Sequence, residues 1–338
     1  MAKVTIDDVA KKAGVSIKTV SRVLNKESNV RQQTRERVQK AIDSLNYHPD
    51  PVARRLAGSR SYLIALLYDA SSAGYVMDIQ GGVLKTCQSE NYELVIHPCD
   101  HLANVVPEVH NLIDHLGIDG ILLTPPMCDM PELVMALQKK GIPFASIAPG
   151  DRQFASATVH TNDREVSAEM TSYLASLGHE KIGFIIGHPD HKAVGNRFAG
   201  YKEGLERSGL EFDASLTAQG FNTFESGVEC GILLLRRENR PTAIFASNDE
   251  MAAGIMRVAH QLKLRVPEDL SVVGFDDLPV AKQMYPSLTT VRQPIRAMAE
   301  TATRLLLGVL RGEAPDGAPL IPCRPQFRES TCRINGET

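Results

Sequence analysis

The chain has 338 residues, of which 43% are hydrophobic and 23% charged, and its formal net charge is −3. This length exceeds what one small core supports and predicts two or three domains in an ordinary soluble protein. No run approaches the ~18 apolar residues of a membrane span, and the first residues, "MAKVTIDDVAKK", hold no apolar signal region. We therefore expect a cytoplasmic protein that makes no contact with a membrane.

Charge is unevenly distributed along the chain. Residues 1–60 hold 13 Lys and Arg against 6 Asp and Glu, about +7, so the remainder carries about −10. A small basic head on an acidic body predicts a nucleic-acid partner for the N-terminal part. The six cysteines form no C-x-x-C pair, which favours buried free thiols in a reducing compartment.

Residues 1–46 read as three short helices that share one core. The first has Thr5 as a helix cap and Gly14 just past its end, and the second begins after Ser16. Apolar side chains recur on one face of each helix at the spacing of a buried stripe. They are Ile6, Val9, Ala10 and Ala13, then Val20, Val23 and Leu24, then Val38, Ile42 and Leu45.

The opposite face of the second helix is suited to DNA. A helix, a Gly-containing turn and a second helix form a helix-turn-helix, whose second helix can enter the major groove. There Arg22 can pair with guanine or phosphate, Lys18 can donate to guanine, and Ile17 can contact a thymine methyl group. Hydroxyl and amide groups add contacts to bases or phosphates: Ser16, Thr19, Ser21 and Asn25, with Thr5, Ser28 and Asn29 as backbone anchors.

Residues 47–60 read as a linker with a helix inside it. Asp50 is a good helix cap, Pro51 suits the first helical position and Gly58 suits the end. About seven residues is far below the length at which an isolated helix is stable in water. We expect this helix to form only with a partner.

From residue 61 onward, buried strands alternate with helices. This pattern predicts parallel sheets with helices on both faces, arranged as two lobes. Ligands bind beyond the carboxyl ends of such strands, and these ends carry Asp69, Pro125, His188, Phe221, Asn248, Asp276 and Gln293. With Arg197, which opens a helix, this set suits a polyhydroxylated ligand. In a purely structural role, Asn248–Asp249 and Asp276–Asp277 would instead cap turns and helices.

The N-terminal segment resembles a known family. "VTIDDVAKKAGVSIKTVSRVLN", followed by "VRQQTRERVQKAIDSLNYHPDPVARRLAG", is similar to the DNA-binding domain of LacI/GalR bacterial transcription regulators. The resemblance implies that Ile17, Lys18 and Arg22 read bases. It also implies that residues 50–58 are a hinge helix that folds in the minor groove as part of a dimer. Leu56 then lies where the family inserts a wedge between base steps, with Ala53 packed nearby and Arg54 and Arg55 facing phosphates.

The body resembles the same family's regulatory domain, which shares its fold with periplasmic sugar-binding proteins. The matching segments are "GNRFAGY", "ASNDEMAAG", "SVVGFDD" and "SLTTVRQP". The resemblance implies an effector-binding and dimerisation domain at 61–330, with an N-lobe at about 61–160 plus 293–325 and a C-lobe at about 161–292. It marks Arg197, Asn248, Asp276 and Gln293 as effector contacts. Further cleft-facing positions are Asp69, Tyr75, His191, Phe221 and Asn222.

Two positions depart from the family pattern and leave the effector open. Ala148 stands where some sugar-responsive members carry an acid, and Ala193 stands where several carry a small hydroxyl residue. A sugar or glycoside is the first expectation for the effector. The alternative is a purine base or nucleoside that acts as corepressor.

These features together predict a homodimeric regulator, a repressor of carbohydrate-utilisation genes, that binds a palindromic operator. We expect no enzyme, since neither a Gly-rich nucleotide loop nor a G-x-S-x-G elbow is present. We also expect no cofactor and no metal. His188, Asp190 and His191 lie close together, but no H-E-x-x-H motif or paired cysteine accompanies them.

Overall fold

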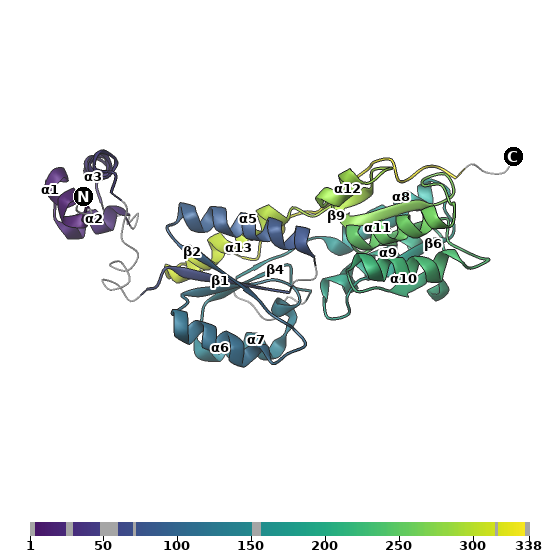
Figure 1. The fold of residues 1–338 in the computed structure, drawn as a ribbon, viewed down its shortest axis with the longest axis horizontal. Helices are drawn as coiled ribbons and strands as arrows, with labels where there is room; N and C mark the ends of the chain where they lie inside the picture. The colour runs from purple at the N-terminus through teal and green to yellow at the C-terminus, as the bar shows by residue number, and fades with distance from the viewer. Residues whose placement is uncertain are drawn as a thin grey trace. The chain divides into compact units, whose positions relative to one another are not determined.

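The computed structural model describes residues 4–24, 30–47, 60–69, 72–150, 157–314 and 317–334. The chain forms two compact units, Met1–Ser61 and Tyr62–Thr338 (Figure 1). The second unit is built from two lobes, each with its own sheet.

The first unit is a small bundle of three helices. They are α1 (Ile6–Ala13), α2 (Ile17–Leu24) and α3 (Gln32–Leu45). Each contributes at least one fully buried valine, Val9, Val20 or Val38, to a single core. The helical periodicity of the sequence therefore predicted both the helices and their inward faces.

The first lobe contains a five-stranded parallel sheet in the order β2-β1-β3-β4-β5. Its strands are β1 (Leu63–Tyr68), β2 (Glu93–Pro98), β3 (Gly120–Leu123), β4 (Phe144–Ile147) and β5 (Ala157–Val159). Its helical segments are α5 (Ala73–Ser89), α6 (Val105–Leu116), η1 (Met127–Asp129), α7 (Pro131–Lys140) and α13 (Ile295–Leu310).

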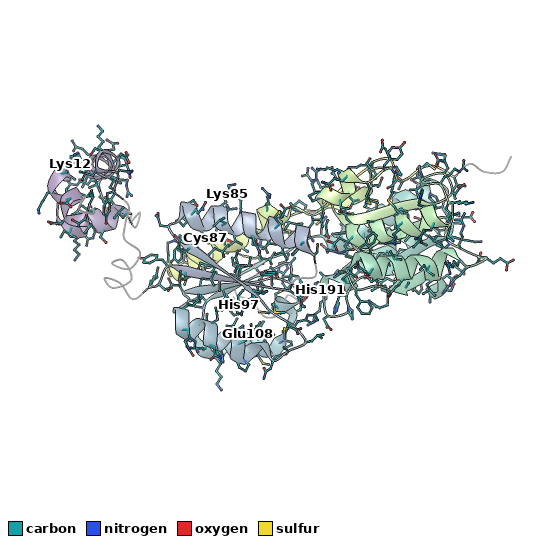
Figure 2. The ribbon with its side chains drawn as sticks, viewed as in Figure 1. Lys12, Lys85, Cys87, His97, Glu108 and His191 are labelled. Atoms are coloured by element: carbon teal, nitrogen blue, oxygen red, sulfur yellow. The ribbon has the colours of Figure 1, made fainter. Side chains whose placement is uncertain are left out.

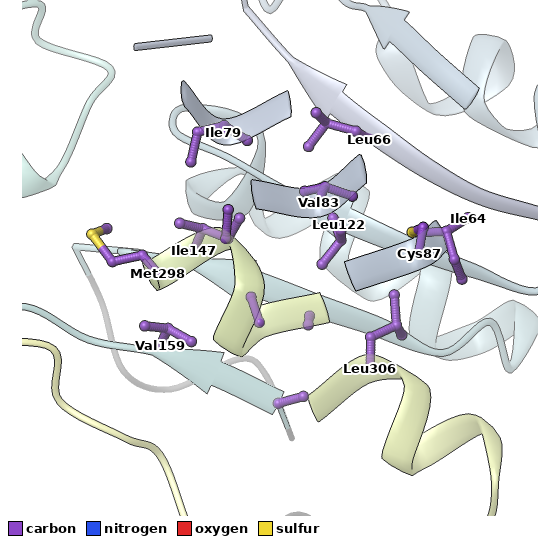
Figure 3. Packing of buried hydrophobic residues seen from close by; sticks show 14 of the residues in the cluster. Ile64, Leu66, Ile79, Val83, Cys87, Leu122, Ile147, Val159, Met298 and Leu306 are labelled. Carbon is purple, nitrogen blue, oxygen red and sulfur yellow. The ribbon is translucent and has the colours of Figure 1, made fainter. Parts of the chain in front are cut away.

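Side chains of β1 alternate between two cores, because successive residues of a strand point to opposite faces. Ile64 and Leu66 pack with α5 and α13 on one face, as Figure 3 shows. Leu63, Ala65 and Leu67 pack with α6 and α7 on the other face. Burial on both faces explains why this strand is apolar without interruption.

The second lobe repeats this plan with a six-stranded sheet in the order β11-β10-β9-β8-β6-β7. Its strands are β6 (Ile182–Ile186), β7 (Thr217–Gln219), β8 (Ala243–Ala246), β9 (Ser271–Asp276), β10 (Thr289–Arg292) and β11 (Arg324–Gln326). Its helical segments are α8 (Asp163–Ser176), α9 (Ala193–Arg207), η2 (Ala214–Leu216), α10 (Phe224–Leu235), α11 (Asp249–Gln261) and α12 (Pro279–Gln283). Phe184 and Phe245 pack toward α8 and α9, whereas Ile185 and Ile244 pack toward α10 and α11.

The chain passes between the lobes three times: from β5 to α8, from β10 to α13, and from α13 to β11. The expected limit of the N-lobe at 325 falls inside β11, which pairs antiparallel with β10 in the second sheet. Three residues with no periodicity of their own give no sequence signal for that pairing.

The fold class predicted from the sequence is confirmed, with a helical head and a two-lobed α/β body built on parallel sheets. Cys87, Cys99, Cys128, Cys230, Cys323 and Cys332 are free thiols, and all but Cys332 are buried. Among the described residues, no helix combines the length and the apolar character needed to cross a bilayer.

Candidate functional site

The turn between α1 and α2 is set by local backbone chemistry. Thr5 and Asp8 form a reciprocal cap, in which each side chain accepts the other residue's backbone N–H at 3.4 and 2.9 Å. The Thr5 hydroxyl lowers the pKa of the Asp8 carboxyl. Gly14 ends α1 with φ +63°, a left-handed conformation that glycine adopts without strain. Ser16 then caps α2 by accepting the Thr19 N–H at 3.2 Å.

The two faces of α2 differ in the way that the sequence predicts. Val20 and Val23 are buried in the head's core, and Leu24 packs against it. On the other face Ile17 is 47% exposed, which is unusual for a large apolar side chain on a small domain. Lys18 is exposed, and Thr19, Ser21 and Arg22 are partly buried. An exposed isoleucine beside cationic and hydroxyl groups suits a DNA groove.

Several predicted DNA contacts lie outside the described residues. They are Asn25, Ser28, Asn29 and the whole hinge segment 50–58, with Ala53, Arg54, Arg55 and Leu56. The hinge helix and its leucine wedge stay predictions.

A cleft between the two lobes gathers eight of the nine predicted effector contacts. It encloses about 620 Å³ of empty space, partly open to solvent. Its lining comprises Asp69, Ser72, Tyr75, Thr124, Pro125, Ala148, His191, Ala193, Val194, Arg197, Asn222, Asn248, Asp276 and Gln293. Both lobes contribute side chains to this lining.

Arg197 is the central cation of the cleft. Its Nε donates to Asp163 Oδ2 at 2.9 Å and its Nη1 to the Ser247 carbonyl at 2.5 Å. Its guanidinium lies 3.7 Å from the ring centre of Phe275. Burial opposes its charge, but Asp163 and Asp276 outweigh burial and raise the pKa of Arg197. The guanidinium is therefore a fixed, charged donor on the second lobe.

Asp276 is a buried acid near Arg197 that Arg197 does not hydrogen-bond. Its Oδ1 lies 3.8 Å from Arg197 Nη1, beyond hydrogen-bond distance. Burial raises the pKa of Asp276 to about 7, although Arg197 acts to lower it. Its backbone also has φ +111°, and two other cleft residues, Ala148 and Asn222, have positive φ. Conformations that non-glycine residues rarely adopt gather at binding sites.

The structural roles considered for the acid and amide pairs are also present. Asn248 caps α11 by accepting the Met251 N–H and donates to the Asn222 carbonyl. Asp249 is fully buried, where it accepts the Leu278 N–H and the Thr290 hydroxyl, and burial raises its pKa well above the usual value. Asn248 thus combines a helix cap with a place in the cleft wall.

Two polar atoms of the cleft are buried without a hydrogen-bond partner among the described residues. They are His191 Nε2 and Gln293 Oε1. Burial and the neighbouring His188 lower the pKa of His191 to about 4, so its ring is neutral at pH 7. Figure 2 labels His191, which lies where the two lobes meet. A buried polar atom left unpaired costs about 1–3 kcal/mol, so these two atoms are suited to a bound ligand.

Phe221 is the predicted effector contact that does not line the cleft. It is 46% exposed, and its ring lies 5.6 Å from that of His188. Conversely, Ser72, Thr124 and Val194 line the cleft without having been predicted as contacts. Thr124 directly follows β3, so the strand-end rule that selected Pro125 could also have selected Thr124.

The lobes touch at the rim of the cleft. Ser72 donates to Glu250 of the second lobe at 3.0 Å, and His101 Nε2 lies 3.1 Å from Asp190. Asp129 accepts the N–H groups of Gly150 and Lys192 at 2.9 and 3.3 Å. A Cβ on Gly150 would lie 2.2 Å from the Lys192 Cβ, so closure at this point requires glycine.

Comparisons with known proteins find matches to both parts of the chain. Residues 5–50 match bacterial regulatory proteins of the lacI family, and residues 171–331 match the periplasmic binding protein-like domain. The chain is 33% identical to the "HTH-type transcriptional repressor PurR" of Vibrio atlanticus (strain LGP32), over 90% of this chain and 91% of that one. This chain belongs to the LacI family of bacterial regulatory proteins. Its family membership favours a DNA-binding transcription regulator over an enzyme, as predicted.

Two solved structures share the fold of this LacI-family chain over nearly its whole length. One is a lac repressor dimer bound to operator and the anti-inducer ONPF, with TM-score 0.76, 29% identity, and coverage of 98% of this chain and 100% of that one. The other is a "transcriptional regulator CelR-cellobiose complex", with TM-score 0.74, 29% identity, and coverage of 97% and 100%.

Proposed function

We propose that this protein is a repressor whose operator affinity is set by a small effector in the interlobe cleft. The observation that carries the proposal is the cleft itself, with its buried Arg197 and Asp276 and the two unpartnered atoms of His191 and Gln293. An effector bound there contacts both lobes and stabilises their contact. Such coupling between two sites is typically ~1–3 kcal/mol.

A sugar or glycoside fits the cleft best. Its lining combines side chains that can donate with side chains that can accept: Arg197, Asn222 and Asn248 with Asp69, Asp276 and Gln293. Vicinal hydroxyls both donate and accept, so they match such a wall. The similar structure with bound cellobiose adds support.

A purine base or nucleoside acting as corepressor is the second candidate. The similarity to the "HTH-type transcriptional repressor PurR" of Vibrio atlanticus favours it. Against it, Phe221 lies outside the cleft, which leaves Tyr75 and His191 as the aromatic side chains in the lining. A planar base gains much of its affinity from stacking on aromatic side chains.

We also propose that the working form is a cytoplasmic homodimer on a palindromic operator, since two recognition helices then meet half-sites about one helical turn apart. Large apolar side chains are exposed on the second unit, including Met77 on α5 and, at 94%, Tyr285. A second copy would remove such side chains from water. The operator-bound dimer of the similar lac repressor supports this arrangement.

A ligand panel tests the effector. Thermal-shift and calorimetric titrations of the full chain with sugars, glycosides, nucleobases and nucleosides should give binding with a sugar or glycoside. Gln293→Ala should weaken that binding about tenfold. It removes Oε1, a buried acceptor that no described residue hydrogen-bonds and that is therefore available to the ligand. Gln138→Ala, an exposed glutamine on α7, is the matched control. Binding of nucleobases alone would establish the second candidate, and undiminished affinity in Gln293→Ala would refute the site.

A further inference from the structure

A cluster at the cleft rim offers three metal-ligand side chains from both lobes. His101 lies in the segment after β2 of the first lobe, whereas His188 and Asp190 follow β6 of the second. One donor atom from each of the three lies within 4.8 Å of the other two. Among the residues that the structure describes, this is the group of three or more His, Cys, Asp or Glu side chains that meets this condition.

The distances suit a tetrahedral transition-metal ion. His101 Nε2 lies 3.1 Å and His188 Nδ1 3.8 Å from Asp190 Oδ2. With bonds of ~2.0–2.1 Å to zinc, neighbouring ligand atoms lie roughly 3.3 Å apart, so the groups need to move by less than about 1 Å. The Asp190 N–H donates to His188 Nδ1 at 3.2 Å, so this nitrogen carries a lone pair and no proton, and an ion that binds it takes the place of that N–H.

A second observation concerns the nitrogen of His101 that faces away from the cluster. Its Nδ1 lies 2.6 Å from Asp69 Oδ2. Its Nε2 faces Asp190 Oδ2 at 3.1 Å, so without an ion the ring can donate to both acids. A metal that binds Nε2 takes the place of the proton directed at Asp190, while Asp69 still holds Nδ1. Metal-binding histidines are oriented by a carboxylate in this way, and the arrangement raises their basicity. Asp69 and Asp190 also supply negative charge that offsets a divalent cation.

We propose that this cluster binds one divalent transition-metal ion, with zinc as the best chemical match, and that the bound ion joins the two lobes. His101, His188 and Asp190 are the ligands, and Asp69 positions His101. Two imidazoles with one carboxylate favour zinc over magnesium, which prefers all-oxygen sites. Because the ligands come from both lobes, the ion binds tightly only when the lobes touch.

This proposal does not depend on the identity of the effector. The sequence places His188 and Asp190 close together but gives no sign of the third ligand, since His101 is far from the "GHPDHK" segment along the chain. If the ion and an effector both favour contact between the lobes, each strengthens the binding of the other.

The experiment titrates the EDTA-treated, desalted full chain with ZnCl₂ by calorimetry, with MgCl₂ as the comparison ion. We expect one zinc per chain, a higher melting temperature and no response to magnesium. His101→Gln, from one lobe, and His188→Gln, from the other, should each weaken zinc binding at least tenfold. His97→Gln is the matched control, because His97 contacts a single carboxylate, Glu108, at 2.8 Å (Figure 2).

Two further measurements keep the test decisive. Asp190→Asn changes a side chain that is 50% exposed, so we expect this variant to fold. Melting curves recorded in EDTA verify the fold of every variant. X-ray absorption at the zinc edge should show nitrogen and oxygen neighbours with imidazole scattering. The absence of zinc binding, full affinity in any of the three ligand variants, or sulfur ligands from the cysteines would overturn the proposal.

Discussion

Asp276 is the residue whose surroundings depart most from what a carboxylate prefers. It is buried on the second lobe, and no donor among the described residues hydrogen-bonds its side chain. The nearby guanidinium of Arg197 is already bonded to Asp163 and to the Ser247 carbonyl. Burying a charge without hydrogen bonds is costly, which is why the pKa of Asp276 rises to about 7. A ligand hydroxyl group could donate the hydrogen bond that the Asp276 carboxyl lacks.

Asp276→Asn should therefore stabilise the ligand-free protein at neutral and basic pH. In the unfolded chain this carboxyl ionises near pH 4, and in the folded chain near pH 7. The native state binds the extra proton between these values, so wild-type stability falls as pH rises across this window. The advantage of Asn should grow from about pH 4 to pH 7 and then level off, at no more than about 4 kcal/mol.

Denaturation of both proteins at several pH values from 4 to 8 checks this. Other groups, such as His191, titrate in both proteins and cancel in the difference. A difference in unfolding free energy that does not vary with pH would mean that Asp276 is ionised throughout.

At the scale of elements, one face of α2 packs in the core of the head and the opposite face is available to DNA. Val20→Ala removes methyl groups from a fully buried position and should cost about 1–3 kcal/mol of head stability. Ile17→Ala, three residues earlier, should change stability by less than about 0.5 kcal/mol, since its side chain is half exposed. Specific operator affinity should fall about tenfold in Ile17→Ala, while affinity for unrelated DNA stays the same.

Melting curves and binding to operator and random DNA measure both effects. If Ile17→Ala destabilised the head as strongly as Val20→Ala, the isoleucine would be a core residue and not a reader of DNA. Equal losses on both DNAs would also contradict a sequence-reading role.

Much of this could be predicted from the sequence because elements follow local patterns. Periodicity identified the helices of the head, and buried strands pointed to parallel sheets whose carboxyl ends bring Asp69, Asn248 and Asp276 together. The direction of a single side chain at a strand end is not encoded this way. Asn222 adopts a left-handed backbone and lines the cleft, whereas its neighbour Phe221 does not. Contacts between distant segments, such as β11 with β10, depend on tertiary packing alone.

At the scale of the two-lobed unit, closure rests on a few contacts that each need both lobes. Leu278 of the second lobe is buried in the first lobe's core, beside Gly74. Ser72 binds Glu250, and Asp129 holds the start of α9. A ligand shifts such an equilibrium only by its preference for one arrangement, and an effector that touches both lobes has that preference.

Gly150→Ala should therefore disable effector sensing without disturbing either lobe. The added Cβ would meet the Lys192 Cβ at 2.2 Å and its backbone carbon at 2.5 Å, so the lobes cannot approach fully. We expect effector affinity to fall at least tenfold and the effector to lose its influence on operator binding. Gly195→Ala is the control. It adds the same methyl group on helix α9, where the new Cβ would meet no atom within 4 Å.

Calorimetry with the sugar or base that the ligand panel identifies, and operator binding with and without it, measure both effects. If Gly150→Ala bound effector normally, contact between Gly150 and α9 would not be part of the switch. If both alanine variants lost affinity equally, the loss would come from the substitutions in general and not from blocked closure.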